Sequence, residues 1–272
     1  MGLRINTNIA ALNTTRILRS STLDLNKSLE RLSSGLRINS ASDDAAGLAI
    51  AEGFRSIVLG SGVAQRNAQD GISLIQTAEG ALATTTEILQ RIRELAVQAA
   101  TGTVSSSNRA ALDAEVQQLA QQINAIATQT EFNGVLILSS TATITVQAGA
   151  RSGQTLNIIL SGAQQAQIGL TVLSISSVLG ANSALLAVDS ALQLVTTTRS
   201  NLGAQQNRLE FSIRTLAIQE ENSAASESAI RDADIARETI RFTRNQILVS
   251  AGTSILAQAN IVPQTALQLL GG

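Results

Sequence analysis

The sequence predicts a mainly α-helical protein: an elongated rod of long antiparallel coiled-coil-like helices formed by both ends of the chain, with a small β-hairpin region in the middle. Apolar residues recur at heptad spacing over long stretches, and this period disappears only between residues 132 and 180. The composition agrees, since 44% of the 272 residues are hydrophobic but only 1% are aromatic. A continuous helix over residues 182–228 spans roughly 70 Å, more than the roughly 50 Å diameter of a compact globule of this length, so we expect a rod.

The start of the chain predicts one helix, a break and a second helix. Leucines at helical spacing form a short stripe: Leu18, Leu25, Leu29, Leu32 and Leu36. Ser33-Ser34-Gly35 is typical of a helix C-terminus. Ser42-Asp43-Asp44 predicts the N-cap of the next helix, with two carboxylates in its favourable first turn.

Two long helices follow, and the break at Thr101–Ser105 predicts that they run antiparallel. Between residues 71 and 100 three adjacent heptad rows are apolar, wide enough to pack against more than one partner. The rows are Ile75, Leu82, Leu89, Ala96; Leu74, Ala81, Ile88, Leu95; and Ala78, Thr85, Ile92, Ala99. Between residues 108 and 130 the apolar steps alternate between four and three, as in a coiled-coil seam: Leu112, Val116, Leu119, Ile123 and Ile126.

The middle of the chain predicts β structure. Phe132-Asn133-Gly134 is a turn signal, and residues 143–146 alternate as a strand does. Residues 149–153 turn the chain, so that residues 155–160 return as the second strand of a hairpin. We expect residues 168–175 to add another short strand.

The C-terminal half predicts a long helix and a looser terminal one. Its main heptad row is apolar throughout: Val188, Val195, Leu202, Leu209 and Leu216. A stripe near the end contains Ile240, Ile247, Ala251, Ile255 and Ala259, and Pro263 is expected to interrupt or kink it. No charge follows Arg244. We therefore expect both ends to need each other and further copies of the chain, and to be disordered alone.

The composition excludes several function classes. The chain has no Cys, so it has no disulfide or thiolate nucleophile. It has no His, so it has neither a Ser-His-Asp triad nor an HExxH metal site. A net charge of −1 gives no general attraction to nucleic acid. We therefore expect no cofactor, no enzymatic activity and no nucleic acid partner. We also expect no membrane insertion, since no run of 18 residues is solidly apolar.

The short motifs have structural explanations. Asp232-Ala233-Asp234 is better explained as a charged turn of helix near Arg231 and Arg237 than as a metal site. Arg237, Arg241 and Arg244 form a basic stripe, interpreted as a polar face that is solvated or pairs with a neighbouring subunit. Lys27 is the only lysine and is expected on an exposed helical face beside Glu30.

Several segments together resemble the bacterial flagellins. The N-terminal matches are LERLSSGLRINS from Leu29, DDAAG from Asp43, NAQDGISLIQTAEGA from Asn67, QRIREL from Gln90 and TEFNGV from Thr130. The C-terminal matches are NLGAQQNRL from Asn201, IRDAD from Ile230 and AQAN from Ala257. These matches keep the family's order and cover nearly the whole chain outside residues 136–182.

The resemblance implies a filament subunit with an inner coiled-coil domain from both termini and an outer domain of helices and β-hairpins. We expect inner-domain parts at residues 1–43 and 230–272. The outer domain would comprise N-terminal helices at 44–131, a β-hairpin region at 132–181 and a long helix at 182–229. A chain this short has no room for the large variable outer domains of longer flagellins.

The resemblance also implies partners and contact residues. The expected partners are further copies of the chain, filament cap and hook-associated proteins, a flagellar export chaperone and a host innate flagellin receptor. The expected location is secreted, in the extracellular flagellum. Subunit and receptor contacts are expected at Gln90, Arg91, Glu94, Leu95 and, on the next helix, Glu115. In addition, Glu87 is spaced to pair with Arg91. Leu267, Leu269 and Leu270 match leucines that serve assembly and cytosolic flagellin sensors.

Other functions stay open at this point. The nearest alternative is a hook–filament junction protein, which shares similar termini. A flagellin with an inserted metalloprotease would need HExxH, which a chain without histidine lacks. An unrelated translocator or coiled-coil adhesin would share the heptads but not the ordered motifs.

Overall fold

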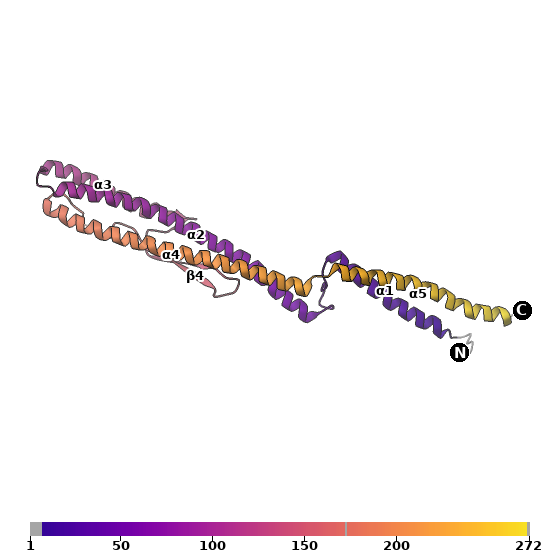
Figure 1. Cartoon of the computed structure of the whole chain (residues 1–272). Helices are drawn as coiled ribbons and strands as arrows, with labels where there is room; N and C mark the ends of the chain where they lie inside the picture. Colours follow the sequence, from indigo (N-terminus) through magenta and orange to yellow (C-terminus); the bar gives the residue numbers. More distant parts are fainter. Residues whose placement is uncertain (1–6, 172, 271–272) are drawn as a thin grey trace. The chain divides into compact units, whose positions relative to one another are not determined.

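The computed structural model describes the backbone of residues 7–171 and 173–270, and the side chains of these residues up to position 261. This part of the chain is mainly helical with two small antiparallel sheets, as predicted (Figure 1). The elements are α1 Ile9–Ser34, α2 Ala45–Ala100, α3 Ser106–Gln129, β1 Glu131–Phe132, β2 Val135–Leu136, β3 Ala142–Gln147, β4 Thr155–Leu160, α4 Val178–Arg231 and α5 Ile235–Leu270. The chain divides into two compact units, one of residues 1–55 with 222–272 and the other of residues 56–221. The expected domain boundaries lie elsewhere, at 43/44 and 229/230.

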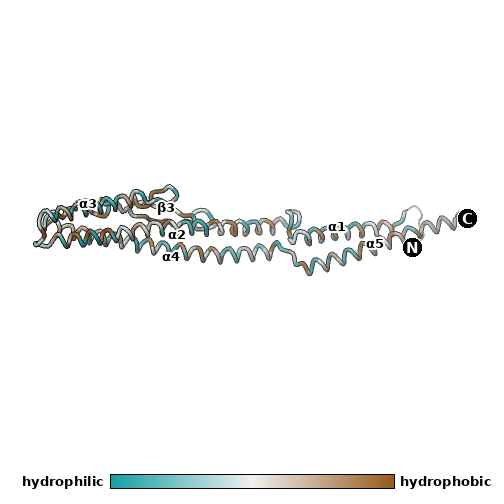
Figure 2. The backbone as a smooth tube through the Cα atoms, turned by 90° about the horizontal axis from the view of Figure 1, so that it is seen from above, coloured by the Kyte–Doolittle hydropathy of each residue, from teal (hydrophilic) through white to brown (hydrophobic). Residues whose placement is uncertain are grey.

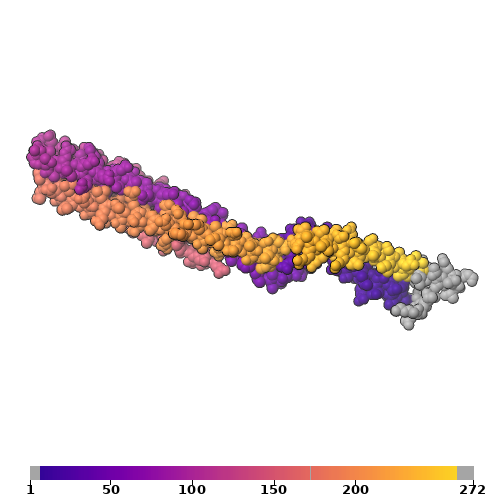
Figure 3. Space-filling model, viewed as in Figure 1, coloured from indigo at the N-terminus to yellow at the C-terminus, as the bar shows by residue number. Residues whose placement is uncertain are grey.

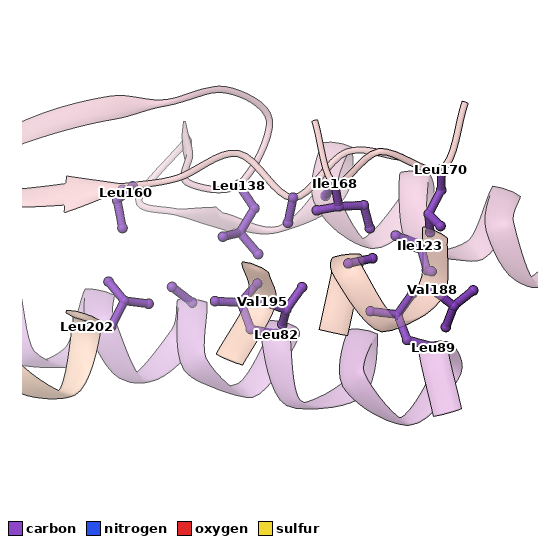
Figure 4. Close-up of a cluster of buried hydrophobic side chains, with 14 of the residues drawn as sticks. Leu82, Leu89, Ile123, Leu138, Leu160, Ile168, Leu170, Val188, Val195 and Leu202 are labelled. Atoms are coloured by element: carbon purple, nitrogen blue, oxygen red, sulfur yellow. The ribbon is translucent and has the colours of Figure 1, made fainter. Parts of the chain in front are cut away.

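The core of the 56–221 unit forms where α2, α3 and α4 meet. Two of the α2 rows, containing Ile75 and Ala78, and the main α4 row containing Val188 are buried along their length. Figure 4 shows Leu82 and Leu89 of α2 pointing toward Val188 and Val195 of α4. Burial of each leucine or valine side chain stabilises the folded unit by about 1.5–3 kcal/mol, so these rows hold the unit together.

Ion pairs between α2 and α4 show the relative direction of the two helices. Charged pairs flank the α2–α4 seam, with Arg93 Nε 2.7 Å from Asp189 Oδ1 and Arg199 Nη2 2.7 Å from Glu79 Oε1. Residue numbers rise on α2 as they fall on α4, so the two helices are antiparallel. Helix α3 folds back on α2 after residues 101–105, where the loop was predicted.

A hairpin covers part of the α2–α4 seam. Strands β3 and β4 pair antiparallel with Thr143 opposite Ile159. Gly71 of α2 lies against the hairpin, since an added Cβ would be 3.2 Å from Ile158 of β4 and 3.3 Å from Val146 of β3. A glycine at this position therefore lets the sheet lie close to the helix. The predicted hairpin at 143–160 is confirmed.

Side-chain amides from the helices bond to both outer edges of this hairpin. Gln205 of α4 accepts a hydrogen bond from the Ile159 amide at 2.8 Å and donates one to the Ile159 carbonyl at 3.3 Å. Asn67 of α2 donates to the Gln147 carbonyl on the opposite edge at 3.3 Å. A free strand edge presents unpaired backbone groups, and these amides take the place of a third strand.

The strand expected at residues 168–175 is wrong. No strand is found there among the described residues 161–171 and 173–177, although Ile168, Leu170 and Ile175 are buried. Figure 4 shows Ile168 and Leu170 beside Ile123 of α3. The segment is held by α3 side chains instead of a ladder: Asp113 accepts from the Ile175 amide at 2.6 Å. Alternating apolar residues thus mark burial here without a strand partner.

Helices α1 and α5 lie side by side and antiparallel in the other unit (Figures 1 and 3). Gly252 of α5 faces Leu18 of α1, since a Cβ at Gly252 would be 3.2 Å from Leu18 Cδ1. Further along, Arg31 of α1 lies 3.9 Å from Glu238 of α5. The α5 stripe predicted at Ile240, Ile247 and Ile255 does not face α1, because these side chains are exposed.

The breaks after α1 and after α4 are joined to each other. Gly35 ends α1 in the left-handed conformation at φ 72°, which favours glycine. Next to it, Leu36 forms an antiparallel β-bridge with Asp232. The Arg37 amide donates to the Arg231 carbonyl at 2.7 Å, and the Ala233 amide donates to the Gly35 carbonyl at 2.9 Å. The predicted helix end at Gly35 is confirmed.

The two aspartates before α2 have different roles from those predicted. Asp44 caps the helix, accepting from the Gly47 amide at 2.8 Å. Asp43 does not lie in the first turn. It accepts from the Asn39 and Ser40 amides in the preceding loop, each at 3.2 Å. The expectation of two carboxylates in the first turn of α2 is wrong, because Asp43 forms its hydrogen bonds with amides of the preceding loop.

Of the two effects expected at Pro263, an interruption or a kink, the interruption is wrong, because the backbone of α5 continues through it to Leu270. Proline has no N–H, so in a helix the carbonyl four residues earlier, at Ala259, loses its partner. Asn8 donates its side-chain amide to that Ala259 carbonyl at 2.8 Å. Its carboxamide oxygen meanwhile accepts from the Ala11 amide at 3.0 Å and so caps α1. One side chain thus starts α1 and compensates for the proline in α5.

The expectation of no membrane insertion stays a prediction. Helices α2 and α4 each contain an 18-residue window that is apolar and long enough to cross a membrane, with mean hydropathy 1.2 and 1.5. This criterion uses length and composition only, and apolar residues of both helices pack into the core described above.

We expect Asn8→Asp to weaken the pairing of α1 with α5 by about 1–2 kcal/mol, because aspartate keeps the cap acceptor but loses the donor to Ala259. Pro263→Ala restores the missing amide within α5, so Asn8→Asp in that background should cost much less. Hydrogen exchange of the α5 amides in the four chains measures the opening free energy. Equal costs in both backgrounds would contradict this coupling.

Candidate functional site

The most prominent candidate surface is the exposed apolar side of the α1–α5 pair, here called the terminal apolar face. Figure 2 shows hydrophobic stretches recurring along both helices. Its large exposed side chains are Ile9, Leu12, Ile17, Leu23 and Leu29 of α1 with Ile235, Ile240, Ile247, Leu248, Ile255 and Ile261 of α5. Exposed fractions reach 63% at Leu12 and 64% at Ile240. Many large exposed apolar side chains on two paired helices are typical of an interaction site.

The interior of this pair contains little apolar core. Among the α1 and α5 side chains that the structure describes, those classed as buried are Ser21, Ser28 and Glu238. The α2–α4 seam, in contrast, buries leucine and valine side chains in successive heptads. Without a buried apolar core, the contact between α1 and α5 supplies little of the free energy that holds long helices together.

A shallow apolar groove runs along the terminal apolar face on α5. Its volume is about 450 Å³, and its lining residues are Thr239, Ile240, Thr243, Arg244, Ile247 and Leu248. All of these residues belong to one helix, so the groove lies between side chains of successive turns. A complementary apolar side chain from another chain could fill it.

Ion pairs tie the loop before α2 to α1. Lys27 Nζ lies 2.8 Å from Asp43 Oδ1, so the expectation of Lys27 beside Glu30 is replaced by a contact with the loop. Glu30 instead accepts from Asn39 at 2.6 Å. The Lys27 hydrogen bond, helped by the Ser40 and Asn39 amides, lowers the pKa of Asp43 from 3.8 to about 2.

A charged patch lies where α2 and α3 run together, and it contains the predicted contact residues. Arg91 Nη2 is 2.9 Å from Glu115 Oε1, and Arg91 Nη1 is 3.1 Å from Glu94 Oε2. These carboxylates, Glu115 first, raise the pKa of Arg91 above its ordinary value. The structure therefore brings Arg91, Glu94 and Glu115 together. Glu87 was expected as the partner, but Arg91 reaches Glu94 and the next helix instead.

The remaining predicted contact residues divide into three cases. Gln90 is exposed beside Arg91, so it is available to a partner. Leu95 is only 2% exposed and packs in the core of its own chain. Leu267, Leu269 and Leu270 lie on the backbone of α5, but their side chains fall outside the part that the structure describes.

The other short motifs have local roles. Asp234 caps α5 by accepting from the Arg237 amide at 3.1 Å, and Asp232 accepts from the Ser228 hydroxyl at 2.6 Å. The sequence Asp232-Ala233-Asp234 is therefore a break between α4 and α5, where a charged turn of helix was expected. In the described residues, no group of three His, Cys, Asp or Glu side chains is placed to hold a metal ion.

Sequence reasoning missed the outward residues of α1. The predicted leucine stripe does not include four large apolar residues of α1 that are exposed: Ile9, Leu12, Ile17 and Leu23. The sequence did contain a signal. In an ordinary surface helix the positions outside the apolar stripe are polar, but in α1 four of them are isoleucine or leucine.

Family models match both ends of the chain. Residues 5–143 match the bacterial flagellin N-terminal helical region, and residues 185–270 match the bacterial flagellin C-terminal helical region. Together the two models cover most of the sequence.

Curated relatives match along their whole length. A flagellin of Halalkalibacterium halodurans is 47% identical over 269 residues, covering 98% of this chain and 99% of the relative. A flagellar filament 31.3 kDa core protein of Treponema maltophilum is 40% identical, with the same coverage of both chains. A flagellin of Bacillus subtilis is 42% identical, covering 98% of this chain and 100% of the relative.

Solved structures share the fold. The crystal structure of Bacillus cereus flagellin has a TM-score of 0.51 at 33% identity, covering 60% of this chain and 94% of that one. A putative flagellar hook-associated protein from Vibrio parahaemolyticus has a TM-score of 0.59 at 13% identity, covering 70% and 100%. At that identity the second likeness concerns the fold alone.

We expect the Lys27–Asp43 pair to make stability depend on acid pH. Because the pKa of Asp43 is depressed in the folded chain, its contribution is full above 3.8 and is lost as the pH falls toward about 2. Lys27→Met should raise the Asp43 pKa toward 3.8, as measured by carboxyl-carbon NMR titration. The control Asp24→Asn removes a nearby exposed carboxylate and should leave the Asp43 titration in place. An unchanged Asp43 pKa in Lys27→Met would disprove the assignment.

Proposed function

This chain belongs to the bacterial flagellin family and is a structural subunit of the flagellar filament, and we propose that its subunits bind one another through the terminal apolar face. The observation that carries the proposal is the contrast between exposed and buried residues on α1 and α5. Their isoleucines and leucines are turned outward, whereas their buried positions hold Ser21, Ser28 and Glu238. Copies of the chain would bury the apolar side chains that one chain leaves exposed.

The polymer is open because its contacts join different surfaces of successive copies. A heterologous contact that does not close into a ring produces a helical filament. The terminal apolar face occurs on both α1 and α5, so a single subunit can present apolar surface to more than one neighbour. The relatives include a flagellin and a flagellar filament core protein, so this chain is placed in the flagellar filament, with the outside of the bacterial cell as its proposed location. Secretion through the flagellar export channel, with an export chaperone and with cap and hook-associated proteins as partners, is part of the proposal.

The domain division is proposed on the same basis. Residues 1–43 and 230–272 would form the inner coiled-coil domain and residues 44–229 the outer one, including the hairpin region at 132–181. The support is the change in core composition, from Ser and Glu between α1 and α5 to Leu and Val between α2 and α4.

We expect removal of residues 245–272 to abolish polymerisation, because it deletes much of the terminal apolar face. Ile247→Asp tests the same surface with one side chain. Ile247 is 62% exposed, so aspartate should leave the unassembled chain folded but raise the critical concentration about tenfold or more. Ile247→Leu is the matched control. Sedimentation with and without filament seeds measures assembly, and full polymerisation of the truncated chain would contradict the proposal.

We also propose that the patch of Gln90, Arg91, Glu94 and Glu115 is read by a host innate flagellin receptor of the Toll-like class. The patch is exposed and holds Arg91 between two carboxylates, which suits recognition by a charged partner surface. Leu95 is buried and would act by positioning the patch. Leu267, Leu269 and Leu270 are proposed to bind cytosolic flagellin sensors, on the resemblance of sequence alone.

We expect Arg91→Ala to reduce receptor signalling by unassembled protein at least tenfold in a reporter-cell assay, since arginine is frequent among interface residues that dominate binding. Arg93→Ala is the matched control, because Arg93 lies two residues away and pairs with Asp189 on another side of α2. Equal signalling by the Arg91→Ala chain and the parent would exclude the patch as the recognition site.

A hook–filament junction protein is the second candidate. The structural likeness to a hook-associated protein supports it at the level of fold only. The filament subunit is favoured because flagellins are 42–47% identical over nearly the whole chain. Electron microscopy after seeding separates the two, since a junction protein does not grow long filaments.

A further inference from the structure

A polar hollow lies between α1 and α5, and Arg244 lines both this hollow and the apolar groove on α5. Its volume is about 270 Å³, far more than a single water molecule requires. Lys27, Ser28 and Arg31 line it from α1, and Glu238, Arg241 and Arg244 line it from α5. A space of this size between two paired helices can admit a small ion of several atoms.

The charge of the hollow is positive. Its lining carries four cationic side chains and two carboxylates, Glu238 and Asp24. Lys27 is neutralised by Asp43 of the adjacent loop at 2.8 Å. Arg31 and Arg241 share one carboxylate, that of Glu238. The Glu238 Oε2 lies 3.9 Å from Arg31 Nη1 and 3.3 Å from Arg241 Nη1. Two guanidinium groups on one carboxylate leave positive charge facing the hollow.

Two of the arginines have unused hydrogen-bond donors. The Arg31 Nε is buried and has no hydrogen-bond partner within the described part of the chain, which is unusual for a buried charged donor. Arg244 forms no ion pair or hydrogen bond with the residues that the structure describes, although it lines the hollow. A guanidinium group presents donors in a fixed planar fork, which suits the oxygen atoms of a carboxylate or phosphate.

We propose that this hollow binds a single oxyanion, with inorganic phosphate as its simplest example. The anion would accept hydrogen bonds from Arg31 on α1 and Arg244 on α5 and so bridge the two helices. Where a neighbouring copy supplies the oxyanion as a side-chain carboxylate, the same donors would bind it.

Equilibrium dialysis of radiolabelled phosphate tests this on the full-length chain, unassembled and as sedimented polymer, at constant ionic strength set with chloride. We expect saturable binding of one phosphate per chain. Arg244→Gln should weaken it about tenfold, because it removes one charged donor. Asn245→Asp, a change of similar shape that adds a carboxylate to the lining, should also weaken it about tenfold.

The matched control is Arg237→Gln. Arg237 lies on the same helix, its side chain is 74% exposed, and it is not part of the lining, so phosphate binding should be unchanged. Binding to the unassembled chain but not to the polymer would identify a neighbour's carboxylate as the occupant. No saturable binding in either form, or equal binding by the parent, Arg244→Gln and Asn245→Asp, would overturn the proposal.

Discussion

The packing of α2 against α4 through their heptad rows is the contact on which the rest of the 56–221 unit depends. Leu82 and Leu89 meet Val188 and Val195 along this seam, and the rows continue far in both directions. Helix α3, the hairpin and the irregular segment before α4 all add their apolar side chains to this one cluster. Since none of these additions has a core of its own, each is stabilised only after the two long helices have paired.

Polar side chains on the helices then complete the backbone hydrogen bonding of everything laid over that seam. Gln205 and Asn67 bond to the two edges of the hairpin, and Asp113 bonds to the segment that would otherwise need a strand partner. Asn8 does the same for the carbonyl that Pro263 leaves without a donor. Buried or half-buried backbone N–H and C=O groups need hydrogen-bond partners. In this chain, side chains on the long helices and at the N-cap of α1 supply them.

Periodicity was sufficient for the helices and the main hairpin because burial repeats with the helix or strand itself. It failed at residues 168–175, where apolar residues are buried but the hydrogen-bond partner is Asp113, 62 residues away in the sequence. Periodicity also placed Leu95 correctly in an apolar row, whereas the family resemblance grouped this buried residue with Gln90 and Arg91, which are exposed on the same helix. On α5 the predicted stripe of Ile240, Ile247 and Ile255 is exposed. The contacts of Glu238 with Arg31 and of Gly252 with Leu18 show which side faces α1.

The two units therefore differ in what specifies them. The seam of α2 and α4 buries its apolar rows within one chain, so its sequence is sufficient to determine its packing. The α1–α5 pair buries Ser28 and Glu238 and exposes Ile240 and Ile247, so its apolar side chains are unsatisfied in a single chain. A polar interior costs stability but fixes register, because Glu238 has its arginine partner at one alignment of the helices. Such a pair is aligned by its own charges, and under the proposed function the remaining stabilisation comes from neighbouring subunits that cover its exposed apolar side chains.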